Sequence, residues 1–251
     1  MNYKNLLTEF IVNVISNRYS DFSFIYFFGS QINGVARKDS DIDLIIVFTK
    51  KTTPFHESFS EGGKIFDVFV FDAETLNYNI QICPKIGQYS TIEIICGSTV
   101  LPQATFESEH LKSCARYIEN SAQWEVPDLD SVRYFLTSLI IDLEFCIDKR
   151  EINFLAAELY KTLVEIILLK RGKGGYVRKH TARALKKFNP LMDEKLNNSL
   201  EKAISNADTA DLVVLAKAVL AELGGELKDG FKKQMRESGR LPLVNPNKVI
   251  R

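Results

Sequence analysis

Two acidic residues at the start of an apolar segment constrain this chain more than any other feature. Asp41, Ile42 and Asp43 open an apolar run that continues to Phe48. Because side chains alternate along a strand, Asp41 and Asp43 point to the same side. Neighbouring carboxylates repel each other unless a cation lies between them, and Mg²⁺ favours oxygen ligands that it shares with substrate phosphates. The pair therefore predicts a magnesium site.

A glycine-containing turn precedes this acidic pair. The apolar run 22–28 ends at Gly29 and Ser30, and residues 31–40 separate the turn from Asp41. The order predicts a strand, a turn, a short helix, a loop and a second strand. Glycine allows close approach of the backbone to a ligand, and a helix N-terminus offers free N–H groups to anions. A phosphate-binding turn beside a metal site favours phosphoryl or nucleotidyl transfer.

The combined pattern resembles the signature of the nucleotidyltransferase superfamily related to DNA polymerase beta. That signature is an apolar residue, Gly-Ser or Gly-Gly, a spacer, and Asp-x-Asp in an apolar strand. Gly34 and the segment 40–44 match the variant of small bacterial members, including aminoglycoside nucleotidyltransferases, although Ile32 stands where alanine is common. The resemblance implies an α+β fold, with a mixed-sheet domain followed by an all-α helical bundle. It also implies two Mg²⁺ ions and ATP, or another nucleoside triphosphate, as the donor.

A third carboxylate lies in the next apolar run. Residues 64–71 predict a strand that is apolar except for Asp67 at its centre. The superfamily carries a third carboxylate on such a strand, so the resemblance implies that Asp67 is a metal ligand, the general base, or both. A structural aspartate whose hydrogen bonds are satisfied is the alternative. Asp72 precedes a helical pattern and is predicted to be its N-cap.

The other segments of the N-terminal part give weaker signals. Residues 2–17 repeat apolar side chains at helical spacing and predict an amphipathic helix. Residues 50–63 are polar and predict a connection in which His56 is a loop residue rather than a ligand. Residues 91–100 predict a further strand with a solvated Glu93.

After Pro102 the pattern becomes helical. The predicted helices are 106–120, 131–148, 152–169, 178–188, 190–207, 209–223 and 226–238, followed by an irregular tail. The helix 152–169 is apolar on most sides and is therefore expected at the centre of a bundle. The change in pattern predicts a nucleotidyltransferase domain over 1–104 and a helical domain over 105–251.

The helical part resembles, more weakly, the C-terminal domain of aminoglycoside nucleotidyltransferases. The shared features are a long apolar helix, a glycine turn at 172–175, a lysine that opens the next helix, and a helix begun by Pro190. The resemblance implies that Lys179, alone or with Arg178 or Arg183, contacts the nucleotide phosphates. A solvated basic helix face is the alternative. In some relatives the general base comes from the helical domain, and Glu144 and Glu158 are the candidates here.

Composition limits the class of protein. Lys plus Arg equals Asp plus Glu at 32 each, so no broad basic surface is predicted and a long nucleic-acid template is not expected. The four cysteines lack CxxC spacing and the three histidines show no metal-ligand pairing, which favours reduced thiols in a cytoplasmic protein without zinc. The apolar runs are too short to cross a membrane, so no membrane partner is expected.

The sequence thus predicts a Mg²⁺-dependent enzyme that moves a nucleoside monophosphate, AMP from ATP by default, onto a hydroxyl group and releases pyrophosphate. The resemblance makes a small molecule such as an aminoglycoside-like antibiotic the leading acceptor, with a role in antibiotic resistance. Two alternatives stay open. One is an adenylyltransferase acting on a partner protein, and the other is a nucleotide-binding module without catalysis.

Overall fold

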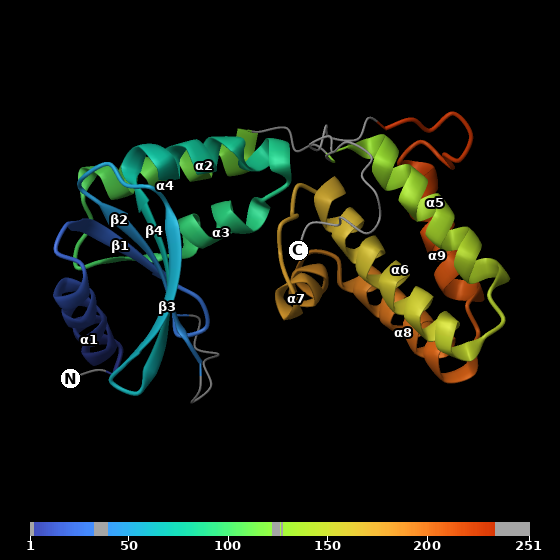
Figure 1. The fold of residues 1–251 in the computed structure, drawn as a ribbon, viewed down its shortest axis with the longest axis horizontal. Coiled ribbons are helices and arrows are strands. Elements are labelled where there is room, and N and C mark those ends of the chain that lie inside the picture. Colours follow the sequence, from blue (N-terminus) through green and yellow to red (C-terminus); the bar gives the residue numbers. More distant parts are fainter. Residues whose placement is uncertain (1–2, 33–39, 122–125, 127, 234–251) are drawn as a thin grey trace, which may run out of the picture.

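The computed structural model describes residues 3–32, 40–121, 126 and 128–233. The elements in chain order are α1 (Tyr3–Arg18), β1 (Phe22–Phe28), β2 (Ile42–Phe48), β3 (Phe55–Glu61), β4 (Lys64–Asp72), α2 (Ala73–Ile86), α3 (Tyr89–Gly97), β5 (Thr99–Leu101), α4 (Phe106–Ser121), α5 (Leu129–Phe145), α6 (Lys149–Lys170), α7 (Lys179–Phe188), α8 (Pro190–Asn206) and α9 (Ala210–Glu222). Figure 1 shows a sheet unit and a helical unit that face each other, with α7 between them.

The sheet unit is built on a five-stranded mixed sheet in the order β3-β4-β2-β1-β5. Only β2 and β4 pair in parallel, and the other three pairs are antiparallel. The parallel pair is separated in sequence by the hairpin strand β3, which lies at the edge of the sheet. This arrangement confirms the predicted α+β class with a mixed sheet.

One face of the sheet is covered by α1. Leu7, Ile11, Val14 and Ile15 of this helix are buried and share one core cluster with alternate residues of the central strands. These strand residues are Ile25, Phe27, Ile42, Leu44, Ile46, Phe66, Val68 and Val70. The helix predicted over 2–17 is confirmed in its described part, and its apolar spacing is what buries it.

The opposite face is covered by α2, α3 and α4. A second core cluster joins Phe24, Tyr26, Ile45 and Val47 of the strands to side chains of these helices. Leu111 and Ala115 of α4 belong to this cluster, so α4 packs in the sheet unit. The division predicted at residue 104 precedes α4, so the change to a helical pattern begins one helix before the change of core. The predicted N-cap Asp72 is confirmed, since its side chain accepts a hydrogen bond from the Thr75 N–H at 2.8 Å.

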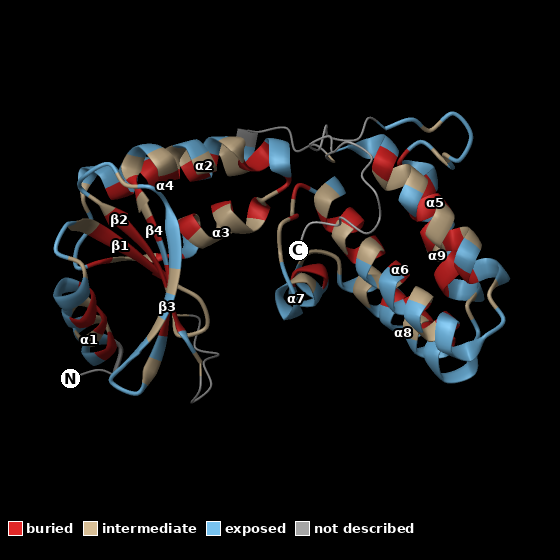
Figure 2. Ribbon diagram, in the orientation of Figure 1, coloured by how far each residue is buried: buried red, intermediate tan, exposed pale blue. Residues whose placement is uncertain are grey.

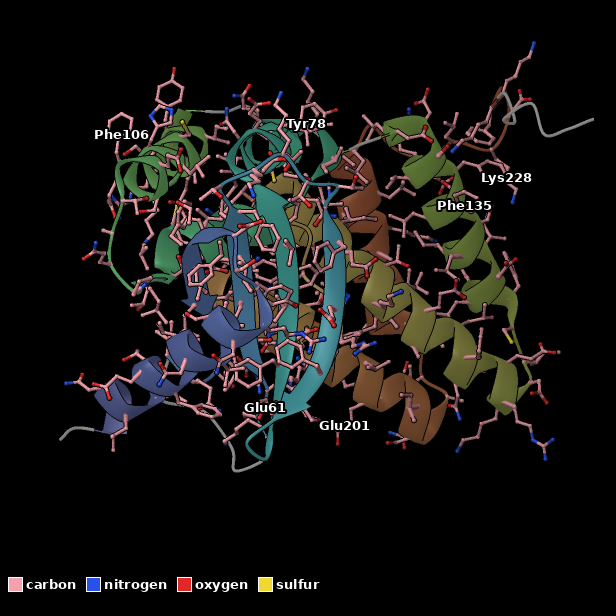
Figure 3. The ribbon with its side chains drawn as sticks, turned by 60° about the vertical axis from the view of Figure 1, so that its left-hand side comes forward. Glu61, Tyr78, Phe106, Phe135, Glu201 and Lys228 are labelled. Atoms are coloured by element: carbon pink, nitrogen blue, oxygen red, sulfur yellow. The ribbon has the colours of Figure 1, made fainter. Side chains whose placement is uncertain are left out.

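The helical unit comprises α5 to α9. Helix α6 packs against α5, α7, α8 and α9, which confirms its predicted central place. Its buried side chains lie on several sides, and Figure 2 shows the red interior of this unit between the helices. Figure 3 shows the labelled Tyr78 of α2, Phe106 of α4 and Phe135 of α5 on the outside of their units, where each is exposed.

The segment predicted as a connection, residues 50–63, contains the strand β3. It pairs with β4 through a hairpin in which Glu61 faces Lys64, and the two turn residues Gly62 and Gly63 both have positive φ. Two adjacent glycines between strands are a known hairpin signal. The strand was missed because an edge strand pairs on one side only and keeps polar side chains.

The strand predicted over 91–100 is also wrong for most of its length. Residues 89–97 form α3, and only Thr99–Leu101 form the short strand β5. The β-branched residues of this segment favour a strand locally. However, Tyr89, Ile92 and Ile95 are buried at helical spacing, so packing overrides that preference.

The final helix predicted over 226–238 is not present in its described part, because residues 226–233 are irregular. Phe231 instead stacks on Tyr134 of α5 with ring centroids 4.1 Å apart. The predicted tail and Gly34 lie outside the described residues. Within the described part of the chain, the structure contains no helix that is both long and apolar enough to span a membrane.

Candidate active site

The pairing of β2 with β4 places two of the predicted carboxylates next to each other. Asp43 and Asp67 are direct partners in this parallel register. Alternation puts both on the sheet face that carries Ile45 and Val47, which is the face covered by α2, α3 and α4. Ile45 and Val47 are buried under these helices, whereas Asp43 and Asp67 are partly exposed on the same face. Asp41 directly precedes β2 and is exposed.

Gly29 lies directly against the carboxylate of Asp43. Phe28, the last residue of β1, pairs with Asp43, and Gly29 follows with φ +85°. A Cβ atom at Gly29 would lie 2.0 Å from Asp43 Oδ2, so any other residue here would displace the Asp43 carboxylate. The glycine is therefore required both by its backbone conformation and by the close approach of the carboxylate. The structure thus brings the predicted turn and the predicted metal ligand together.

The Asp43 carboxyl group is partly buried and lies near two other carboxylates. Burial, then the Asp67 carboxylate, then the Asp41 carboxylate raise the pKa of Asp43 from 3.8 to about 6. The positive charge of Lys179 acts in the opposite direction and lowers the pKa. Like charges that crowd a half-buried carboxyl group favour its protonated form unless a cation joins them. A cation bound beside Asp43 would therefore offset this repulsion.

His56 is a site residue that sequence reasoning missed. Its Nε2 lies 2.5 Å from Asp67 Oδ1, and its ring stacks on Phe69 with centroids 4.3 Å apart. The residue lies on β3, paired with Phe69, and alternation places it on the same face as Asp67. The prediction of a loop residue is therefore wrong. The Gly62-Gly63 hairpin signal would have revealed the strand and its register.

Lys179 approaches the site from the helical unit. It is the first residue of α7 and is exposed, and its charge reaches Asp43. Arg183, one turn further along α7, is exposed as well. Burial, and then the charges of Arg183 and Lys179, lower the pKa of His180. Helix α7 is therefore a basic element near Asp41, Asp43 and Asp67, which we call the acidic edge although β2 and β4 are inner strands of the sheet.

A family model matches the part of the chain that carries this geometry. Residues 9–90 match the family model described as Polymerase beta, Nucleotidyltransferase. This segment belongs to the DNA polymerase beta-like nucleotidyltransferase superfamily. It contains β1 to β4, and with them Gly29, Asp41, Asp43, His56 and Asp67.

A solved structure, that of a nucleotidyltransferase-like protein from Exiguobacterium sibiricum, is similar over 86% of this chain and 74% of that chain, with 11% sequence identity and a TM-score of 0.43. No curated protein is significantly similar to the chain. The family model ends at residue 90, so α4 and the helical unit lie outside the match.

The nucleotidyltransferase domain supplies oxygen ligands suited to Mg²⁺, but not the full predicted set. Among the described residues, no group of three or more His, Cys, Asp or Glu side chains is arranged to hold a metal ion. The predicted triad of Asp41, Asp43 and Asp67 is thus not assembled, and Asp67 contacts His56 instead. Mg²⁺ commonly takes one or two carboxylates together with water and substrate phosphates. The neighbouring Asp43 and Asp67 fit that smaller requirement.

The two carboxylates considered as alternative bases lie in the helical unit. Glu144 of α5 accepts two hydrogen bonds from Lys217 of α9, at 2.8 and 2.9 Å. Figure 1 shows α5 and α9 on the side of the helical unit away from the nucleotidyltransferase domain. Glu158 is exposed on α6. Asp67 is therefore the candidate base that the structure brings beside Asp43.

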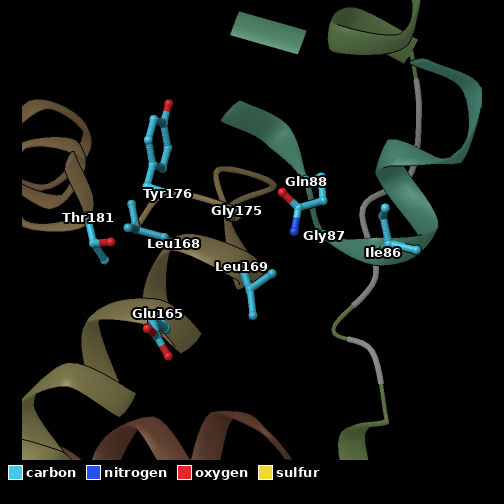
Figure 4. A pocket seen from close by; sticks show the side chains of 10 residues that line it. Ile86, Gly87, Gln88, Glu165, Leu168, Leu169, Gly175, Tyr176 and Thr181 are labelled. Carbon is cyan, nitrogen blue, oxygen red and sulfur yellow. The ribbon is translucent and has the colours of Figure 1, made fainter. Parts of the chain in front are cut away.

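A pocket of about 280 Å³ lies where the turn between α2 and α3 meets the end of α6 and the start of α7. Figure 4 shows Gln88 and Ile86 on one side of it, with Glu165 and Thr181 on the other. None of the predicted carboxylates lines this pocket. It belongs to the junction between the units rather than to the acidic edge of the nucleotidyltransferase domain.

Proposed function

We propose that this chain transfers a nucleoside monophosphate from a nucleoside triphosphate to a hydroxyl group, with Mg²⁺ and with release of pyrophosphate. The observation that carries the proposal is the direct pairing of Asp43 with Asp67, with Gly29 packed against the Asp43 carboxylate. This combination places negative charge and an open backbone turn at one point of the sheet edge. ATP is the proposed donor because of the family resemblance.

The triphosphate would lie between the sheet edge and α7. Gly29 and Ser30 would offer N–H and hydroxyl donors to its oxygens, and Lys179 would add a positive charge from the other side. The positive charge of Lys179 lowers the pKa of Asp43, which supports this assignment. Such a site favours in-line transfer mainly by positioning and electrostatics.

Asp43 and Asp67 would hold Mg²⁺ together with water and phosphate oxygens. When bound, the ion would neutralise charge on the attacking and leaving oxygens of the phosphoryl group. Asp67 is also the proposed acceptor of the proton from the attacking hydroxyl, as a general base. The hydrogen bond from His56 would orient the Asp67 carboxylate for either task.

The proposed acceptor is a small hydroxylated molecule, such as an aminoglycoside-like antibiotic, and this choice rests on the family resemblance. A hydroxyl group on a partner protein is the second acceptor class. A module that binds nucleotide without transferring it is the second candidate function. The observation that favours this module is that the three aspartates are not arranged as a metal-binding group.

The test is incubation of the protein with α-labelled ATP, Mg²⁺, and either a panel of aminoglycosides and lincosamides or cell lysate. We expect label on an acceptor and stoichiometric pyrophosphate. Asp67→Asn should bind ATP but turn over 10²–10⁴-fold more slowly, the usual contribution of a general base. Near-normal turnover in Asp67→Asn would remove it from the catalytic set. Nucleotide binding without any labelled product would favour the binding module.

A further inference from the structure

One carboxylate of the sheet unit holds both ends of α7. Glu93, on α3, accepts a hydrogen bond from the hydroxyl of Tyr176, which lies just before α7. It accepts a second from the ammonium group of Lys187, in the last turn of α7. Each contact uses a different oxygen of the carboxylate, and Glu93 is only 32% exposed. The expectation of a solvated Glu93 is therefore wrong.

The loop before α7 is fitted tightly to the start of α3. Ser90 donates its N–H to the carbonyl oxygen of Gly174 at 3.1 Å and its hydroxyl to that of Gly175 at 2.7 Å. A Cβ atom at Gly174 would lie 2.6 Å from the carbonyl oxygen of Gly87. One at Gly175, which has φ +84°, would lie 2.8 Å from the Cα of Gln88. A side chain at either glycine would therefore require the neighbouring atoms to shift.

A cation–aromatic contact closes the same junction. Lys173 Nζ lies 3.6 Å from the centroid of the Tyr89 ring, and burial lowers the pKa of this lysine. The hydroxyl of Tyr89 donates to Glu119 of α4 at 2.6 Å. Cation–aromatic contacts gain strength when the cation is partly desolvated. The loop 173–176 is therefore held by side-chain and backbone contacts at once.

Helix α7 is thus shared between the two units. Its apolar residues Ala184 and Leu185 are buried in the core of the helical unit. Glu93 of α3 contacts Tyr176, in the segment before α7, and Lys187, in the last turn of α7. Lys179 is the first residue of α7 and therefore lies between these attachments, on the helix that Figure 1 shows between the two units. The orientation of α7 relative to the acidic edge is therefore set by α3 as well as by the bundle.

We propose that Glu93 is a positioning residue for the nucleotide site, which acts by fixing α7 and with it Lys179. This inference rests on the proposed function, in which Lys179 contacts the triphosphate. Glu93 itself touches no substrate. Loss of its contacts should weaken triphosphate binding through misplacement of Lys179 and should leave the carboxylate chemistry intact.

The test is a double-mutant cycle between Glu93→Ala and Lys179→Ala, with the Kd of Mg·ATP measured by calorimetry and KM and kcat by pyrophosphate release. We expect each single variant to raise Kd and KM about tenfold, with kcat within about twofold of the wild type. In the Lys179→Ala background, Glu93→Ala should add nothing. A purely structural role would instead add the same factor in both backgrounds.

Single contacts are tested by Lys187→Met and Tyr176→Phe, which keep most of the packing if Glu93→Ala folds poorly. Lys186→Met is the matched control, because it removes an exposed charge from the same turn of α7 without touching Glu93. We expect weaker Mg·ATP binding in the first two variants and wild-type affinity in the control. Equal affinity in Lys187→Met and Lys186→Met, with wild-type affinity in Tyr176→Phe, would overturn the proposal.

Hydrogen exchange separates failure of this inference from failure of the proposed function. If Glu93 holds α7, the amides of residues 179–188 should exchange faster in Glu93→Ala than in wild type, with no ligand present. Unchanged exchange would overturn the positioning role whether or not nucleotide binds. Absence of Mg·ATP binding by the wild type, with faster exchange in the variant, would instead reject the proposed function and confine Glu93 to fixing the helix.

Discussion

The two faces of the same sheet differ in how completely they are covered. On the α1 face, alternate residues of β1, β2 and β4 are apolar and buried, and the three positions of β2 are Ile42, Leu44 and Ile46. On the opposite face, Ile45 and Val47 are buried under α2, α3 and α4, but the row continues to Asp43. The α1 face of these strands is a hydrophobic core throughout. On the opposite face, β2 contributes the core residues Ile45 and Val47 and the candidate site residue Asp43.

This difference follows from the alternation of side chains and from the length of the helical cover. A residue moved by one position along β2 changes face, so the same strand serves both purposes. Carboxylates can persist at the uncovered end because solvent, His56 and a bound cation can satisfy them there, whereas full burial would be costly. The site is therefore held in place by the core on the other face.

Shortening a buried side chain on the α1 face should produce the largest change in stability. Ile46 is fully buried under α1, so Ile46→Ala should lower the free energy of unfolding by about 3 kcal/mol. Urea denaturation monitored by circular dichroism measures this loss. The Kd of Mg·ATP for the folded protein should stay within about twofold of wild type. A small stability loss with a large loss of affinity would contradict the division between the faces.

Substitution at the turn should affect both stability and binding. Gly29→Ala places a side chain in a left-handed conformation, which costs about 1–2 kcal/mol, and its Cβ would displace the Asp43 carboxylate. We expect a lower melting temperature and at least about tenfold weaker Mg·ATP binding, beyond what reduced folding explains. Gly63→Ala is the control, because its φ is also positive but a Cβ there meets no atom within 4 Å. Equal effects of the two variants on affinity would show that strain alone is responsible.

The raised pKa of Asp43 predicts a smaller effect on stability, in which the substitution Asp43→Asn stabilises the protein. Because its pKa is raised from 3.8 to about 6 in the folded state, folding favours the protonated form. The resulting contribution to stability is complete below about pH 4 and is lost as the pH rises through 6. Without metal at pH 7.5, Asp43→Asn should therefore be more stable than wild type by about 1–2 kcal/mol, after allowance for partial solvent exposure.

Denaturation in EDTA at several pH values tests this prediction. The advantage of Asp43→Asn should shrink as the pH falls from 7.5 toward 4, and Mg²⁺ should stabilise the wild type more than the variant. An advantage that is the same at every pH would mean that packing, rather than ionisation, causes it.

Removal of His56 should have the smallest effect of these substitutions. The side chain is half-exposed, so His56→Ala should change the melting temperature little, whereas turnover should fall about fivefold, equivalent to about 1 kcal/mol. His56→Gln, which can still donate to Asp67, should recover most of the rate. Pyrophosphate release measures both. An unchanged rate in His56→Ala would assign the contact to structure alone.

The sequence predicted those elements in which local pattern and tertiary packing agree. The runs around Asp43 and Asp67 are apolar on both faces, so the strands and the carboxylates on them were predictable. The edge strand β3 was not, because pairing on one side leaves its composition polar. His56 was missed for the same reason, since its role depends on the register of that strand.

The contacts between the two units could not be predicted from the sequence, for a different reason. Residues 91–97 are rich in β-branched side chains, which favour a strand locally, and only packing in the second core cluster makes them helical. The helical assignment decides where Glu93 points, and so its contact with α7 could not be anticipated. Similarly, α4 follows the change of sequence pattern but shares the core of the sheet.

The most direct test of the account is calorimetric titration of ATP into the wild type and into Asp43→Asn, each with Mg²⁺ and with EDTA. If the sheet edge binds nucleotide through a metal, the wild type should bind ATP at least about tenfold more tightly with Mg²⁺ than with EDTA. Asp43→Asn should lose this difference, whereas Asp142→Asn, an exposed aspartate of α5, should keep it. Equal Mg²⁺-dependent affinity in the wild type and Asp43→Asn would contradict the assignment of the acidic edge as the nucleotide site.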